Sequence, residues 1–149
     1  MFLRVNGIRI VAAPEDFFRL ISLRRHATRR FDHGDSAQFF SMRERFVSSS
    51  GIAGASAVAL RGAWQTGGAK AVIRAQIAAF DSRDLPFEAA RWRMKAGDVD
   101  GTFRDLDRAY PAHSVWMIGL TVYFESPVVR RDPRYKALLA KMKLPQHKP

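Results

Sequence analysis

The clearest pattern in the chain is a pair of short amphipathic segments in its C-terminal third. In residues 99–110 apolar side chains recur at three- and four-residue intervals, with charged side chains between them. Residues 86–96 come before this segment and begin with Pro86, which suits the first position of a helix. Gly97 and Asp98 separate the two segments as a helix stop followed by a helix cap. The pattern predicts two antiparallel helices that bury their facing apolar stripes.

Within the second of these helices the helical spacing predicts which side faces inward. The inward side is expected to carry Val99, Thr102, Phe103, Leu106, Ala109 and Tyr110. The opposite, solvent side is expected to carry Arg104, Asp105, Asp107 and Arg108.

Helical spacing also covers most of the remaining chain. Apolar residues at three- and four-residue intervals predict further helices at 14–30, 37–47, 69–80 and 133–144. The residues Thr66-Gly67-Gly68 predict a turn before the third of these. The run 115–124 is almost continuously apolar, which fits a buried strand or a buried helix, and we interpret it as a short helix.

The first eleven residues have a different pattern. Two short runs rich in branched residues flank Asn6-Gly7, a dipeptide that favours the type I′ turn of a β-hairpin. We therefore expect a hairpin over residues 2–11. The fold class expected for the whole chain is all-α, with this short hairpin at its N-terminus.

The domain organisation is predicted from composition. The residues Ser48-Ser49-Ser50-Gly51 have the composition of a linker. Residues 1–58 contain nine arginines and no lysine, a bias compatible with a distinct domain, an acquired extension or a start codon assigned too far upstream. We expect an N-terminal extension over residues 1–50, a helical domain over 51–145 and a short tail over 146–149.

Five short motifs follow one another in the C-terminal part of the chain. They are Gly97-Asp98, Ala109-Tyr110, Trp116, Asp132-Pro133-Arg134-Tyr135 and Leu144-Pro145. In this order they resemble the ending of many bacterial tetratricopeptide-repeat (TPR) proteins, whose unit is a 34-residue helix–turn–helix. The resemblance covers about residues 60–145 and implies antiparallel helix pairs that form a fragment of an α-α superhelix.

The resemblance also implies which residues make the packing contacts of the repeat. These are Ala90, Gly97, Leu106, Ala109, Tyr110 and Trp116. Arg93 and Thr102 depart from the family pattern, which has aromatic and small residues there, and Tyr123-Phe124 stands where the family tends to place a turn. Two repeats at most are recognisable, whereas about three stacked units are usual for independent stability. The helical domain would then depend on the N-terminal segment or on a second copy of the chain.

The chain is strongly basic, with 25 Lys+Arg against 14 Asp+Glu and a formal net charge of +11. Such an excess attracts nucleic acid, anionic lipid or acidic protein surfaces. The tightest basic cluster lies at residues 23–30. Its candidate nucleic-acid contacts are Arg24, Arg25, Arg29 and Arg30. The alternative is an ordinary solvated helix face.

The sequence offers no motif for catalysis, a cofactor or a metal. The chain has no cysteine, so it has no thiol nucleophile, disulfide or cysteine-bound metal. No two of its four histidines have the i, i+4 spacing of a helical metal site. The segment 62–70 has glycines and a lysine but lacks the Lys-Ser/Thr pair directly after its second glycine that a phosphate loop needs, and we interpret it as a helix–helix turn.

We therefore predict a non-catalytic TPR-type scaffold that binds another protein or a peptide, or a second copy of itself. The alternative is a basic nucleic-acid-binding module that uses the N-terminal arginine helix. No apolar run approaches the roughly 20 residues that span a bilayer, and Arg4 and Arg9 interrupt the N-terminal apolar stretch, unlike a signal peptide. The expectation is a bacterial cytoplasmic protein without a membrane partner.

Overall fold

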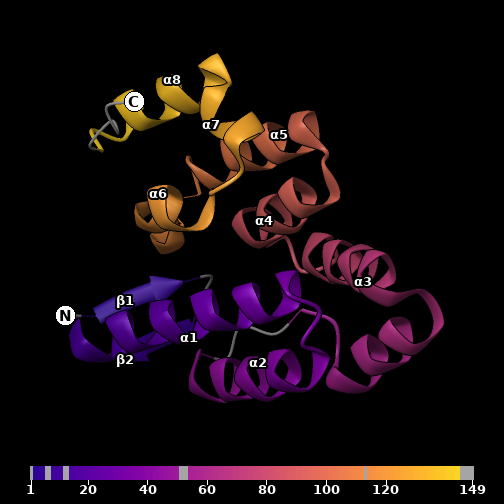
Figure 1. The fold of residues 1–149 in the computed structure, drawn as a ribbon. Helices are drawn as coiled ribbons and strands as arrows, with labels where there is room; N and C mark the ends of the chain where they lie inside the picture. The colour runs from indigo at the N-terminus through magenta and orange to yellow at the C-terminus, as the bar shows by residue number, and fades with distance from the viewer. Residues whose placement is uncertain (1, 6–7, 12–13, 51–53, 113, 145–149) are drawn as a thin grey trace. The chain divides into compact units, whose positions relative to one another are not determined.

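The computed structural model describes residues 2–5, 8–11, 14–50, 54–112 and 114–144. Helices dominate these residues, so the all-α class expected from the sequence is confirmed (Figure 1). The chain divides into two compact units, unit 1 (residues 1–79) and unit 2 (residues 80–149).

Unit 1 begins with two short strands, followed by helices. Its elements in order are β1 (Phe2–Val5), β2 (Ile8–Val11), α1 (Pro14–Asp32), α2 (Ser36–Ser50) and most of α3 (Ala57–Asp81). The strands pair antiparallel, with Phe2 opposite Val11 and Val5 opposite Ile8. The predicted turn residues Asn6-Gly7 lie outside the described residues.

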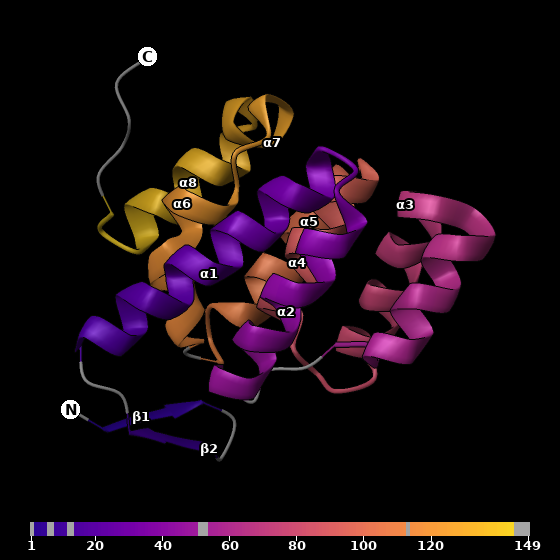
Figure 2. The same ribbon diagram turned by 60° about the horizontal axis from the view of Figure 1, so that its bottom comes forward.

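Helices α1 and α2 form a tight helical hairpin that turns at Gly34 and lie side by side in Figures 1 and 2. Gly34 has φ 72°, a left-handed conformation that glycine adopts without a Cβ clash. The N–H of Asp35 donates to the carbonyl of Arg30 at 2.9 Å, and the N–H of Gly34 donates to that of Phe31 at 3.0 Å. These two bonds make a Schellman end to α1. The Asp35 carboxylate then caps α2 by accepting from the N–H of Gln38 at 3.1 Å.

Helix α3 is two helical segments that fold back on each other. Gly67 and Gly68 leave the helical conformation, as the sequence predicts for a turn at this place. The N–H of Ala55 donates to the side-chain oxygen of Gln76 at 3.0 Å. In one straight helix these residues would lie roughly 30 Å apart, at 1.5 Å per residue. The bend therefore makes α3 a second helical hairpin, visible in Figure 1 where the ribbon doubles back.

Aromatic side chains join the two hairpins of unit 1. The ring of Phe31 lies 5.1 Å from that of Phe39 and 5.9 Å from that of Trp64, centre to centre. Trp64 also lies edge-on to Phe40 at 6.4 Å. Tilted and edge-on rings at such distances attract each other beyond the gain from burial alone. Trp64 therefore fixes the first half of α3 against α1 and α2.

The boundary between the two units differs from the one expected at residues 50 and 51. The units divide at Ala79–Phe80, near the end of α3. The serines expected to form a linker are the last turn of α2. Gly51, the last residue of the expected linker, lies outside the described residues. The Arg43 guanidinium of α2 donates to the carbonyl of Ala55, so Ala55 is held against α2. Composition alone could not reveal this contact, because it depends on one long side chain reaching back across the connection.

Unit 2 contains the predicted helix pair and a set of shorter helices. Its elements after the end of α3 are α4 (Pro86–Ala96), α5 (Val99–Ala109), the 3-10 helix η1 (Val115–Gly119), α6 (Leu120–Tyr123), α7 (Pro127–Arg131) and α8 (Pro133–Lys141). The apolar run is helical over residues 115–123, close to the expected short helix, but changes from 3-10 to α geometry at Leu120. The expected tail at 146–149 lies outside the described residues.

The turn between α4 and α5 has the stop and the cap that the sequence predicts. Gly97 has φ 79°, and its N–H donates to the carbonyl of Met94 at 3.1 Å. The N–H of Asp98 donates to the carbonyl of Arg93 at 3.0 Å, which completes a Schellman end. The Asp98 carboxylate accepts from the N–H of Gly101 at 2.8 Å and so caps α5.

Replacing Gly97 with alanine is expected to lower the free energy of unfolding by about 1–2 kcal/mol, because a side chain at φ 79° is strained. No heavy atom lies within 4 Å of the added Cβ, so the cost is in the backbone alone. The control is Gly62→Ala in the first half of α3, equally open, where alanine should instead stabilise the helix by about 0.5–1 kcal/mol. Urea unfolding of both variants checks this, and two shifts of the same sign would contradict it.

Candidate functional site

The residues expected to make the repeat-packing contacts are mostly in the interior of unit 2. The buried ones are Ala90, Leu106, Ala109 and Trp116. Tyr110 is half-buried, and the Lys141 ammonium of α8 lies 4.2 Å from the centre of its ring. Gly97 is exposed and contributes through its backbone conformation. Four of these side chains therefore have the burial that packing requires.

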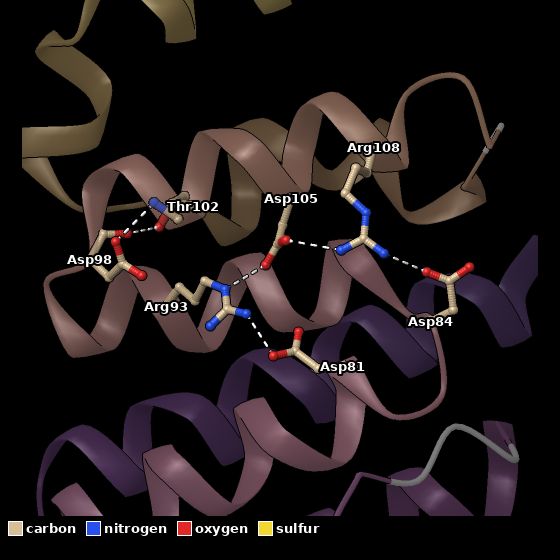
Figure 3. Close-up of polar contacts among 8 residues, drawn as sticks. Asp81, Asp84, Arg93, Asp98, Thr102, Asp105 and Arg108 are labelled. Atoms are coloured by element: carbon tan, nitrogen blue, oxygen red, sulfur yellow. Dashed lines mark hydrogen bonds and ion pairs between the residues drawn. The ribbon is translucent and has the colours of Figure 1, made fainter.

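The main polar feature of unit 2 is an ion-pair network centred on Asp105 (Figure 3). Asp105 has an exposed fraction of 0%. The Nε of Arg93 donates to one of its carboxylate oxygens at 2.7 Å, and Arg108 donates to the other at 3.3 Å. Arg93 comes from α4, whereas Asp105 and Arg108 come from α5. The network therefore joins the two helices of the pair.

Both arginines of the network extend it to the connection between α3 and α4. Arg93 reaches Asp81 at 2.6 Å, and Arg108 reaches Asp84 at 2.6 Å. Burial disfavours the charge on Arg93, but hydrogen bonds and Coulomb attraction from Asp105 and Asp81 outweigh that effect and raise the pKa of Arg93. Its guanidinium is therefore held as a structural cation between three helical segments.

The burial of Asp105 is a correction to the sequence analysis, which placed it on the solvent side of α5. Thr102 and Ala109 are both completely buried, and Asp105 lies three residues after one and four before the other. Residues at these intervals share a helix face, so the spacing was a signal for burial. Asp105 was nevertheless expected in solvent because it is charged. The arginine that neutralises its carboxylate lies on the other helix and could not be identified from spacing. Arg93, which departs from the family pattern, is that partner.

The motif Asp132-Pro133-Arg134-Tyr135 ties α8 to the rest of unit 2. The Asp132 carboxylate caps α8 by accepting from the N–H of Arg134 at 2.9 Å. The side chain of Arg134 reaches Asp132 and Asp100, both at 2.8 Å, and lies 4.4 Å from the ring centre of Phe103. Hydrogen bonds from Arg134 lower the pKa of Asp132. Arg134 therefore joins the start of α8 to α5.

Tyr135, the aromatic residue of this motif, is buried and has a structural position. Its hydroxyl donates to the carbonyl of Leu120 at 3.4 Å, and burial raises the pKa of Tyr135. Nearby, Arg130 donates to the carbonyls of Phe124 and Thr121, both at 2.8 Å, at the end of α6. The two Arg130 donors satisfy carbonyls that a helix end leaves without intrahelical partners.

The basic cluster at residues 23–30 is divided between the interior and the surface of unit 1. Arg24 is 4% exposed, and its guanidinium lies 5.4 Å from the ring centre of Phe46, so we correct its assignment as a nucleic-acid contact. Arg25, Arg29 and Arg30 are exposed, and Arg30 lies 3.5 Å from Asp35. Arg24 is buried because it lies on the side of α1 that also carries Ala27 and Phe31.

Within the described ranges no group of three His, Asp or Glu side chains could hold a metal ion. Among the helices of the same ranges none is long and apolar enough to cross a bilayer. The segment 62–70 forms the bend of α3, in line with its interpretation as a helix–helix turn.

Comparison with known proteins gives no match: no protein-family model, no curated protein and no solved structure is similar to the chain.

Proposed function

We propose that the protein is a non-catalytic helical-repeat scaffold of the tetratricopeptide type that binds another protein or a peptide. The observation that carries the proposal is the spacing of its helical turns. Among the described glycines, Gly34, Gly68 and Gly97 have positive φ, at 72°, 58° and 79°. They lie 34 and 29 residues apart, and each is the bend of a helical hairpin. A tetratricopeptide repeat is one helical hairpin per 34 residues.

Two of the three turns also have the same chemistry. In each, a left-handed glycine ends one helix in a Schellman motif and the next residue, an aspartate, caps the following helix. The pairs are Gly34-Asp35 and Gly97-Asp98. The same combination of a Schellman end and an aspartate cap at two places supports a repeated helix–turn–helix unit in the chain.

The packing inside unit 1 supports stacking of successive units. The α1–α2 hairpin and the α3 hairpin follow each other directly and share the aromatic cluster of Phe31, Phe39, Phe40 and Trp64. Arg61 of α3 adds an ion pair to Glu44 of α2 at 2.8 Å. In solenoid proteins each helical hairpin contacts its neighbour in this way, and the stack presents an extended binding surface.

The use of charge in unit 2 supports a binding role over a catalytic one. The buried carboxylate of Asp105 is neutralised by two arginines, and Glu88 pairs with Arg91 at 3.4 Å in the interior. The two arginines that bond to Asp105 come from α4 and α5, and the Glu88–Arg91 pair lies within α4. These pairs support the helices, whereas a general acid or base needs access to a substrate. The polar groups of this unit therefore support the fold of a scaffold.

The test begins with affinity capture by the whole chain, after sedimentation has established whether it is a monomer or self-associates. A captured protein is then purified and titrated against the chain by calorimetry, with an unrelated protein of similar charge as the control. Amide hydrogen exchange maps the contact. The proposal expects saturable binding that slows exchange in α3, α4 or α5. Binding without saturation, or slowed exchange confined to β1 and β2, would contradict it.

A further inference from the structure

We infer a second interaction surface on unit 1, the exposed face of α1, and propose that it binds the phosphate backbone of nucleic acid. We call it the arginine face and define it as Arg19, Arg25, Arg29 and Arg30, all exposed. The proposal is independent of the scaffold role, which rests on the helical turns rather than on charge.

Helical geometry places these four side chains together. At 100° per residue their directions fall within an arc of about 140°, and at 1.5 Å per residue they extend over roughly 16 Å of α1. The opposite side of the helix carries Arg24, Ala27 and Phe31, which are buried. The four exposed arginines therefore lie on one side of α1 and the buried Arg24 lies on the other. Only the exposed ones present their charge to solvent.

The arginines of α1 outnumber its acids. The helix contains five arginines against Glu15, Asp16 and Asp32, which lie at its two ends. Unit 1 as a whole has 12 Lys+Arg and five Asp+Glu, whereas unit 2 has 13 and nine. In unit 2 several of the arginines bond to carboxylates of their own unit, as Arg93, Arg108 and Arg134 do. The concentration of positive charge therefore favours unit 1 as the place where an anionic partner binds.

The identity of the cations favours phosphate as the ligand group. Eleven of the 12 basic residues in unit 1 are arginines. The planar guanidinium donates two parallel hydrogen bonds to a phosphate, whereas an ammonium acts as a point charge. Arg25 and Arg29 are one helical turn apart, about 6 Å along the axis, and lie on the same side of α1, so two guanidiniums can contact one strand together. A row of phosphates is therefore a better fit to this face than a single anion.

The helix dipole accounts for only part of this face. Arg29 and Arg30 lie in the last turn of α1, where cations stabilise the helix dipole, and Arg30 lies near Asp35. Arg19 and Arg25 lie further from that end and do not gain from it. A lipid surface is less favoured, because the apolar side of α1 is turned into unit 1 and cannot enter a bilayer.

The test measures binding of a labelled mixed-sequence DNA duplex to the whole chain by fluorescence anisotropy, between about 50 and 200 mM KCl. The double variant Arg25→Gln, Arg29→Gln should weaken binding at least about tenfold at the lowest salt. It should also reduce the slope of log K against log salt by about 1.8, since each lost phosphate contact contributes about 0.9. The variant Arg25→Lys, Arg29→Lys should keep most of the slope and lose affinity only moderately, because it keeps the charge but not the bidentate geometry.

The matched control is Arg104→Gln, Arg131→Gln, two exposed arginines of unit 2 whose removal changes the net charge equally. It should change the affinity less than about twofold, because only long-range attraction is lost. Circular dichroism of every variant establishes that the helices are retained. Equal losses from both double variants, no binding of the duplex at low salt, or tighter binding to phosphatidylserine vesicles or polyglutamate than to the duplex would each overturn the proposal.

Discussion

The variant Arg93→Met is expected to lose about 3–5 kcal/mol of unfolding free energy, the usual cost of removing one partner of a buried ion pair. The buried partner is Asp105, which would keep only the longer contact of 3.3 Å to Arg108. Methionine preserves most of the volume and the helix propensity of arginine. The loss of unfolding free energy therefore measures the effect of removing the guanidinium charge and its hydrogen bonds. Because small domains are stable by only about 5–15 kcal/mol, such a loss would be visible as a large shift of the urea midpoint.

Two further variants make this prediction specific to the ion pair. Arg104→Met, an exposed arginine on α5, should change the free energy of unfolding by less than about 0.5 kcal/mol. The double variant Arg93→Met, Asp105→Leu should recover most of the loss, since an apolar pair of similar volume often replaces a buried ion pair at little cost. A double variant as unstable as Arg93→Met alone would show that the carboxylate was not the source of the loss.

The variant Phe87→Ala is expected to cost about 3–5 kcal/mol, because it removes a large side chain from the centre of unit 2 and leaves a cavity. Phe87 is 2% exposed. Its ring lies edge-on to those of Phe124 at 5.6 Å and Tyr123 at 6.3 Å, so it joins α4 to the end of α6. Urea unfolding measures the loss, and the shift should be accompanied by early unfolding of α6 in hydrogen exchange.

Two control variants, a conservative one at Phe87 and one at an exposed apolar residue, test whether the loss comes from the buried volume of Phe87. Phe87→Leu keeps most of the volume and should cost less than half as much as Phe87→Ala. Val128→Ala removes an apolar side chain that is 64% exposed on α7 and should change the free energy of unfolding by less than about 0.5 kcal/mol. Equal losses from Phe87→Ala and Val128→Ala would refute the assignment of Phe87 to the core.

Local features were predictable where neighbouring residues determine them. The Gly97-Asp98 stop and cap follow from chemistry that acts over five residues, so the ends of α4 and α5 could be placed from sequence. The bend at Gly67 and Gly68 was predictable for the same reason, since glycine weakens a helix and adopts non-helical conformations without a Cβ clash. Gly34 lies between two of the predicted helices, but its likeness to the turn at Gly97 was not predicted, because the hydrogen bonds that make the two turns alike are visible only in three dimensions.

Contacts between distant residues could not be predicted in this way. The carboxylate of Asp105 was assigned to solvent because its partner Arg93 lies 12 residues away on another helix. Arg24 was grouped with its exposed neighbours because a basic run gives no indication of which member turns inward. Arg43 bonds to the carbonyl of Ala55, which holds Ala55 against α2. In each case a long side chain reaches a partner whose distance in sequence is unrelated to its distance in space.

The sequence by itself determined the helical class, most helix positions and the turns at Gly67-Gly68 and Gly97-Asp98, because these depend on residues within one or two helical turns of each other. Only the tertiary structure decided which charges are buried, where the two units divide and which arginines remain at the surface. The physical reason is that burying a charge is favourable only when a partner is within bonding distance, and packing between helices decides which partners come that close.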